Sequence, residues 1–144
     1  MQGVVLVYDS KITLFNYHAG LWYTTIIDGV ELVETKGDTA TVSGGMTNAD
    51  VVEAIIPASP DGSINSKPFV GPKEYKVCAD PEGCFTITPE SDFFVVGDHQ
   101  TDPVSDDDYD EGLYHHLNST MDNVYMITSK VFYSLLPHYE IGGR

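Results

Sequence analysis

Short runs in which apolar and polar residues alternate make up the first half of the chain. One run, residues 11–17, places Ile12 and Leu14 on the same face, as expected of a half-buried strand. Asp28-Gly29 lies between two such runs and is a favoured sequence for a hairpin turn. The pattern predicts strands over residues 4–8, 11–17, 21–27, 30–35, 39–43 and 50–56, with a second turn over residues 36–38.

The middle of the chain combines a proline-rich loop with a predicted hairpin. Four of the eight prolines fall within residues 57–73, which favours an irregular loop. Residues 75–79 and 84–88 have strand-like composition, and they flank a Pro-Glu-Gly sequence that suits a type I turn. Cys78 and Cys84 would face each other across this hairpin. Because a chain with two cysteines in a reducing compartment usually keeps them as buried thiols, we expect free thiols here.

The last third of the sequence predicts a buried strand, one helix and a C-terminal β segment. Residues 93–96 read Phe-Phe-Val-Val, a continuous apolar run typical of a strand buried on both faces. Leu113, Leu117 and Met121 are spaced four residues apart, which predicts a helix over residues 113–121. Further β-type runs cover residues 124–128 and 131–133, and residues 138–144 form a last short strand and a tail.

These elements together predict one mainly β domain, a β-barrel or sandwich with one short helix and long loops. A chain of 144 residues provides one domain with little left for a second core. No apolar run approaches the roughly 20 residues that a membrane-spanning helix needs, so we expect no membrane span. The N-terminus has no basic segment and its apolar run ends at Asp9, so we also expect no signal peptide.

The charge of the chain narrows its possible partners. Seven Lys and Arg residues stand against 22 Asp and Glu residues, a formal net charge of −15. Such a surface repels phosphates, which disfavours nucleic-acid recognition. Hydrophobic residues nevertheless make up 42% of the chain, enough for a core.

No motif for catalysis or metal binding is complete. Asp106, Asp108 and Asp110 match positions 1, 3 and 5 of a calcium-binding EF-hand loop, but Glu111 replaces the required glycine and Leu117 the required glutamate. The histidines have no zinc-binding spacing, and the chain has neither a nucleophile elbow nor a phosphate-binding loop. We therefore predict a protein with no enzymatic activity, cofactor or metal. A calcium site of another kind in the acidic segment, residues 102–111, stays open as an alternative.

The order of several segments resembles small structural proteins of tailed bacteriophages. The sequence Ile-Thr-Leu-Phe-Asn opens the domain at residue 12, a strand ends in Ile56-Pro57, and an aromatic strand ends at Gly97-Asp98. The most specific piece is the C-terminal sequence Leu-Pro-His-Tyr-Glu-Ile-Gly-Gly-Arg, residues 136–144. In this order the chain is similar to head–tail connector or head-completion (neck) proteins over residues 11–144.

The resemblance implies a non-enzymatic virion protein that is assembled in the host cytoplasm. Its β domain, residues 11–144, would form a ring of six or twelve copies that joins the portal or adaptor to the tail. Residues 1–10 would be an N-terminal extension. A location in the tail or baseplate is the alternative within the virion.

Contacts between copies are expected at three places along the chain. An N-terminal arm, residues 2–8, can add a strand to a neighbour's sheet. The acidic segment and the C-terminus are the other two. The expected interface residues are Val4, Val5, Leu6 and Val7 in the arm, Asp106, Asp107, Asp108, Asp110 and Glu111 in the acidic segment, and His138, Tyr139, Ile141 and Arg144 at the C-terminus.

Overall fold

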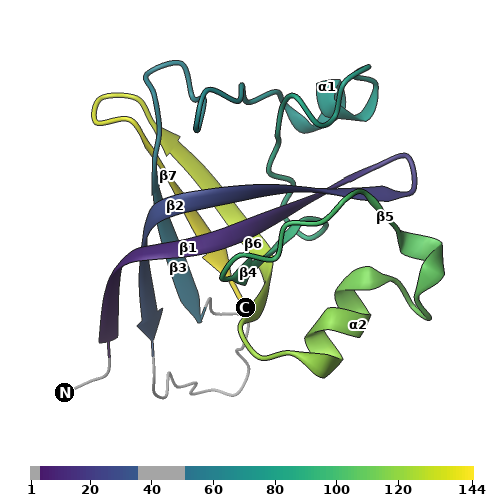
Figure 1. The fold of residues 1–144 in the computed structure, drawn as a ribbon. Helices are drawn as coiled ribbons and strands as arrows, with labels where there is room; N and C mark the ends of the chain where they lie inside the picture. Colours follow the sequence, from purple (N-terminus) through teal and green to yellow (C-terminus); the bar gives the residue numbers. More distant parts are fainter. Residues whose placement is uncertain (1–3, 36–50) are drawn as a thin grey trace, which may run out of the picture.

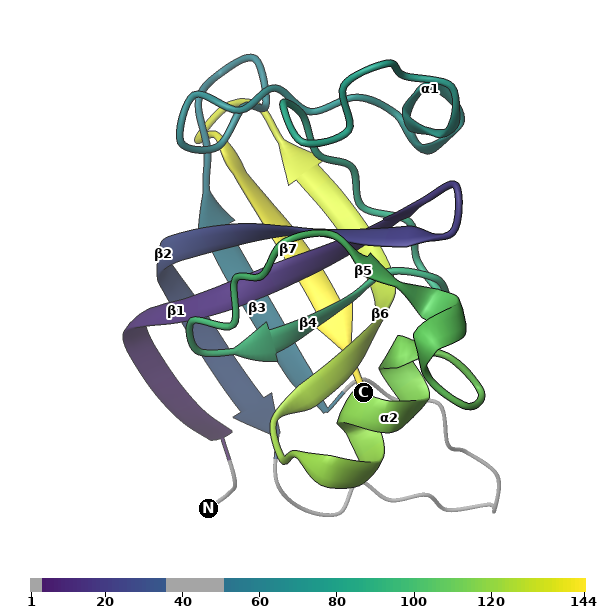
Figure 2. The same cartoon turned by 45° about the vertical axis from the view of Figure 1, so that its right-hand side comes forward.

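The computed structural model describes residues 4–35 and 51–144 and shows a closed antiparallel β-barrel (Figures 1 and 2). Six strands pair around the barrel in the cyclic order β1-β4-β6-β7-β3-β2, and β2 pairs back to β1. Closure removes the exposed sheet edges that an open sandwich would leave. The prediction of a mainly β domain is confirmed, and the choice between barrel and sandwich is decided in favour of the barrel. The elements are β1 (Val4–His18), β2 (Leu21–Thr35), β3 (Val52–Pro57), α1 (Pro72–Lys76), β4 (Phe93–Val96), β5 (Val104–Ser105), the 3-10 turn η1 (Asp106–Asp108), α2 (Leu113–Thr120), β6 (Val124–Tyr133) and β7 (His138–Gly143).

A long hairpin of two 15-residue strands, β1 and β2, forms a large part of the barrel wall. Its turn is Ala19-Gly20, where both residues have positive φ angles of 50° and 86°, as a type I′ turn requires. The predicted turn at Asp28-Gly29 is therefore wrong. Gly29, with φ of 70°, instead lies where the pairing register shifts, so that β2 bulges and continues. The predicted strand and turn over residues 36–43 lie outside the described residues.

The predicted hairpin around the two cysteines is also wrong. Residues 72–76 form helix α1, which begins at Pro72, a residue whose fixed φ suits the first helical position. Tyr75 is buried and its hydroxyl donates to the carbonyl of Pro81, 3.2 Å away. The local sequence favours a strand, but the burial of Tyr75 stabilises the helix.

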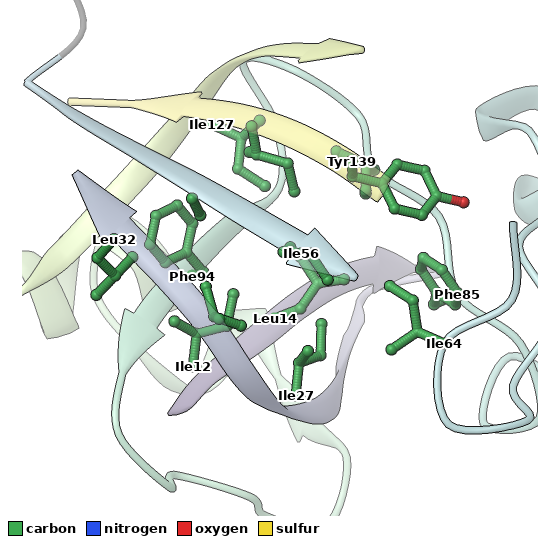
Figure 3. Close-up of a cluster of buried hydrophobic side chains, with 14 of the residues drawn as sticks. Ile12, Leu14, Ile27, Leu32, Ile56, Ile64, Phe85, Phe94, Ile127 and Tyr139 are labelled. Carbon is green, nitrogen blue, oxygen red and sulfur yellow. The ribbon is translucent and has the colours of Figure 1, made fainter. Parts of the chain in front are cut away.

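The barrel interior is filled with aliphatic and aromatic side chains (Figure 3). Alternate residues of each strand point inward, and Ile12, Leu14, Phe94, Ile127 and Tyr139 meet there from β1, β4, β6 and β7. A packed interior of this kind matches small barrels, in which side chains leave no room for a ligand.

Helix α2 covers the outer face of β1 and β4. Phe15, Phe93 and Leu113 belong to this second buried cluster, and the Phe15 and Phe93 rings stack with centroids 4.6 Å apart. Strand β4 is thus buried on both faces, because Phe94 points into the barrel and Phe93 towards α2. The predictions of a doubly buried strand and of a helix at this place in the chain are confirmed.

Candidate interaction surface

The turn between β6 and β7, residues 134–137, exposes two leucines to solvent. Leu135 is 92% and Leu136 is 76% exposed, and Val131 and Tyr133 on the adjoining strand are also exposed. We call residues 131–136 the hairpin tip. Exposed apolar patches of this kind mark interaction sites.

Polar contacts hold the hairpin tip in one geometry. The His138 ring stacks on Tyr133, with centroids 4.9 Å apart. One ring nitrogen of His138 lies 2.6 Å from the Leu136 carbonyl and the other lies 3.0 Å from a Glu140 carboxylate oxygen. Both neighbours are acceptors, so only the protonated imidazolium can donate to both. These two contacts raise the pKa of His138 above its ordinary value.

A cavity of about 560 Å³ lies beside α1, and we call it the α1 cavity. Tyr17 and His18 line it from the end of β1, and Tyr75 and Val77 line it from α1 and its C-cap. Val77 is 81% exposed. The lining is mostly apolar, which is the usual character of a binding pocket.

A buried polar network closes the base of this cavity. Asp92 is almost fully buried and accepts hydrogen bonds from the Asn16 amide at 2.9 Å, from Thr88 N at 2.9 Å and from Tyr17 N at 3.3 Å. Burial raises the pKa of Asp92 to about 6, and the three donors oppose this rise without cancelling it. The network joins β1 to the turn before β4.

Stability should therefore depend on pH through Asp92. Its ordinary pKa is 3.8, so between that value and about 6 the folded chain holds a proton that the unfolded chain has lost. This stabilising proton is fully present below the ordinary pKa and is lost as the pH rises through about 6. We expect wild type to lose stability relative to Asp92→Asn over this range, by ~1.4 kcal/mol for each unit that separates the two pKa values.

Urea unfolding at a series of pH values measures this difference. Asn at this position also changes the local hydrogen bonds, but that change adds an offset that does not vary with pH. A difference between the two proteins that stays constant from pH 4 to 7 would contradict the raised pKa.

The two cysteines, Cys78 and Cys84, are unbonded in the structure. Their sulfur atoms are 3.8 Å apart, and burial raises the pKa of Cys84 to about 11. A thiol that stays protonated at neutral pH is a poor nucleophile, which argues against Cys84 as a catalytic group.

The C-terminal strand contributes fewer surface residues than expected. Tyr139 and Ile141 are buried in the barrel, so their assignment to an interface is wrong. The Tyr139 hydroxyl donates to the Gly62 carbonyl at 2.6 Å, which lets a tyrosine occupy the core. Gly62 has φ of 91°, and a Cβ there would lie 2.9 Å from this hydroxyl, so the contact requires glycine. Of the four predicted C-terminal residues, His138 and Arg144 keep accessible side chains.

The acidic segment is divided between structural and exposed residues. One oxygen of Asp106 accepts a hydrogen bond from the Trp22 indole and another from Leu113 N, each 2.8 Å long. Asp106 therefore holds α2 against the barrel, and its half-buried side chain has a structural role as well as its predicted place at an interface. The other four predicted interface residues of the segment, Asp107, Asp108, Asp110 and Glu111, are exposed. Within residues 4–35 and 51–144, no group of three or more His, Cys, Asp or Glu side chains is placed to hold a metal ion.

Replacing Asp106 with alanine should destabilise the region around α2. The change leaves two partly buried donors without their acceptor, at a cost of about 1–3 kcal/mol. Trp22 is the only tryptophan, so its fluorescence during urea unfolding reports directly on the lost contact. The matched variant Asp107→Ala removes an exposed carboxylate and should change stability by less than about 0.5 kcal/mol. Equal effects of the two substitutions would contradict the structural role of Asp106.

The N-terminal segment forms part of the barrel wall. Val4 to Val7 pair with Thr35 to Leu32 of β2 in the same chain, so the prediction of a free arm is wrong for these residues. The predicted boundary after residue 10 falls inside β1. Among the described strands, only β2 pairs with residues 4–7, and β4 joins β1 further along, over residues 12–15.

The hairpin tip and Val77 were not predicted as interface residues. A signal for the tip was present, because two consecutive leucines precede Pro137 where the alternating pattern of β6 ends. Turns are normally polar, so two consecutive apolar residues there stand out from the pattern. Val77 carried no such signal, because it was expected to lie inside a strand.

The chain is thus a small closed barrel with a packed interior, and its candidate sites lie on the surface. Comparison of the sequence with known families shows the family of the chain. Residues 7–144 match the family of unknown function DUF6751, and the chain belongs to this family. No curated protein and no solved structure matches the chain. Over the described residues, no helix is both long and apolar enough to span a membrane.

Proposed function

We propose that this chain is a non-enzymatic structural subunit that assembles with copies of itself into a ring in the head–tail connector of a tailed bacteriophage. The observation that carries the proposal is the placement of apolar surface. The barrel interior is filled, while Leu135 and Leu136 project into solvent from an ordered turn. Such a chain acts through its surface, and burial of these side chains against another protein is favourable.

The acidic charge fits this role. A ring around a DNA channel must let the polyanion pass, and an acidic lining repels phosphates so that DNA slides past it. The resemblance of residues 136–144 to the C-terminus of connector proteins supports the location between portal or adaptor and tail. These proteins, together with further copies of the chain, are the proposed partners, and the virion is the proposed location.

Native mass spectrometry and negative-stain electron microscopy of the purified chain test the proposal. The chain is measured alone over a concentration series and mixed with a portal protein taken from the same genome. Ring particles of six or twelve copies, alone or on the portal, are the expected result. A chain that stays monomeric under both conditions would contradict the proposal, and immunogold labelling of virions separates a neck location from a baseplate location.

A further inference from the structure

We infer that the hairpin tip of one copy docks into the α1 cavity of a neighbouring copy, which gives a head-to-tail contact that repeats around an assembly. This inference rests on the proposed function, in which the chain binds copies of itself. It adds which two surfaces meet.

The exposed large hydrophobic residues of the described chain gather at these two surfaces. Seven such side chains are exposed. Val131, Tyr133, Leu135 and Leu136 belong to the hairpin tip, Tyr17 and Val77 line the α1 cavity, and Val51 alone lies elsewhere. The apolar surface that one copy leaves uncovered is thus divided between a projection and a hollow.

The size of the cavity suits the projection. Its volume of about 560 Å³ lies within the roughly 300–1,000 Å³ of pockets that bury a small organic ligand. Two leucine side chains have eight carbon atoms and occupy less space than such a ligand. The stacking of His138 on Tyr133 preorganises the tip, which reduces the entropy lost on docking.

Charge favours the same pairing. Two copies with a net charge of −15 repel each other, so contacts are expected where the negative charge is weakest. The α1 cavity carries Lys73 and Lys76 at its lining, and these two charges offset those of Asp92 in the lining and of Glu74 on the same helix. On the other side of the contact, residues 124–139 contain no acidic residue. One acidic residue lies on a neighbouring loop: Asp61 is exposed on the loop that follows β3. This loop is joined to the β6–β7 turn by a hydrogen bond from Ala58 N to the Pro137 carbonyl, 3.2 Å long.

The two surfaces lie at the same end of the barrel but on different sides of it. In both views the β6–β7 turn and α1 stand at the upper end, with the turn to the left and α1 to the right (Figures 1 and 2). A contact between different patches of identical subunits is heterologous, and it produces a closed ring when the repeated rotation closes. The placement of both patches at one level suits rotation about a single axis.

Photo-cross-linking from the tip tests the inference directly. Leu135 is replaced by p-benzoylphenylalanine, the protein is concentrated and irradiated, and the cross-linked peptides are mapped by mass spectrometry. Intermolecular cross-links to residues 72–77 or 17–19 are the expected result. Cross-links to other segments, or none between copies, would overturn the inference. Rings with cross-links elsewhere leave the proposed function standing, whereas cross-linked pairs without rings support the contact and contradict the ring.

Charge substitutions give an independent test. Leu135→Asp blocks the tip and Val77→Asp blocks the cavity, and both side chains are exposed, so both variants should fold. Each should weaken self-association by about tenfold or more. The matched control Val51→Asp introduces the same charge at an exposed valine away from both surfaces and should associate like wild type.

A mixture of the two variants distinguishes a head-to-tail contact from other arrangements. Leu135→Asp retains an intact cavity and Val77→Asp retains an intact tip. The mixture should therefore form 1:1 pairs, detected by native mass spectrometry, that grow no further. Self-association of Val77→Asp at the wild-type level, or a mixture without pairs, would overturn the inference.

Discussion

Replacement of Phe94 with alanine is expected to lower the free energy of unfolding by about 3–5 kcal/mol, which is a large part of the 5–15 kcal/mol typical of a domain. Phe94 is fully buried at the centre of the barrel, where it packs on Tyr125 with ring centroids 5.5 Å apart. Truncation removes buried apolar surface and leaves a cavity between strands that cannot move together, because each is paired on both sides.

Urea unfolding of the wild type and of Phe94→Ala measures this cost. Val131→Ala is the matched control, since it truncates an exposed side chain on β6 and should change stability by less than about 0.5 kcal/mol. A loss below about 1 kcal/mol for Phe94→Ala would contradict a closed barrel with a filled interior.

The second large effect is expected from Asn16→Leu, which should cost about 3 kcal/mol or more. The Asn16 amide donates to the Thr86 carbonyl at 2.6 Å and to Asp92 at 2.9 Å, and its oxygen accepts from Thr86 N at 3.3 Å. Leucine has a similar size but leaves the N–H and carbonyl of Thr86 unpaired and removes one of the three donors to Asp92, at about 1–3 kcal/mol for each lost partner. The substitution should also raise the pKa of Asp92 further, because one of its donors is lost.

Asn118→Leu is the matched control for this prediction. Asn118 is exposed on α2, and leucine has a higher helix propensity than asparagine, so stability should change little. Unfolding in urea at pH 7 separates the two variants. An Asn16→Leu protein as stable as wild type would show that the network beneath the α1 cavity is not needed for the fold.

Tight packing and open apolar surface occur in separate parts of this chain. The Asp92 network and the barrel core pack the chain tightly, while the hairpin tip and the α1 cavity stay open to solvent and are the two surfaces proposed to meet. A rigid subunit suits an assembly that must hold its shape, because docking then costs little conformational entropy.

Strands and helices could be predicted from the sequence where the spacing of apolar residues shows directly which faces of the element are buried. The apolar run of residues 93–96 and the four-residue spacing from Leu113 are examples, and both elements are present. Turn chemistry was a weaker guide. Asp28-Gly29 and Ala19-Gly20 both offer a glycine, and the choice between them depends on how the whole hairpin bends around the barrel.

The candidate site was less predictable because the surroundings of its residues also depend on contacts between distant segments. Tyr139 and Ile141 were expected at an interface, but the inward or outward direction of a strand's side chains depends on which strands flank it. Asp106 belonged to a run of like charges that suggested a solvated segment. Its two donors, on Trp22 and Leu113, become its neighbours only when β2 and α2 come together.

The sequence by itself determined the β-rich class, the place of the helix, the doubly buried strand and the strongly acidic surface, because each depends on composition or on the spacing of near neighbours. Only the tertiary structure decided that the sheet closes, that the tip leucines stay outside and that a cavity forms beside α1. Closure pairs residues such as Phe15 and Phe93, or Val52 and Gly143, that lie far apart along the chain. Such pairings are selected by the summed burial of all strands together, which no local pattern records.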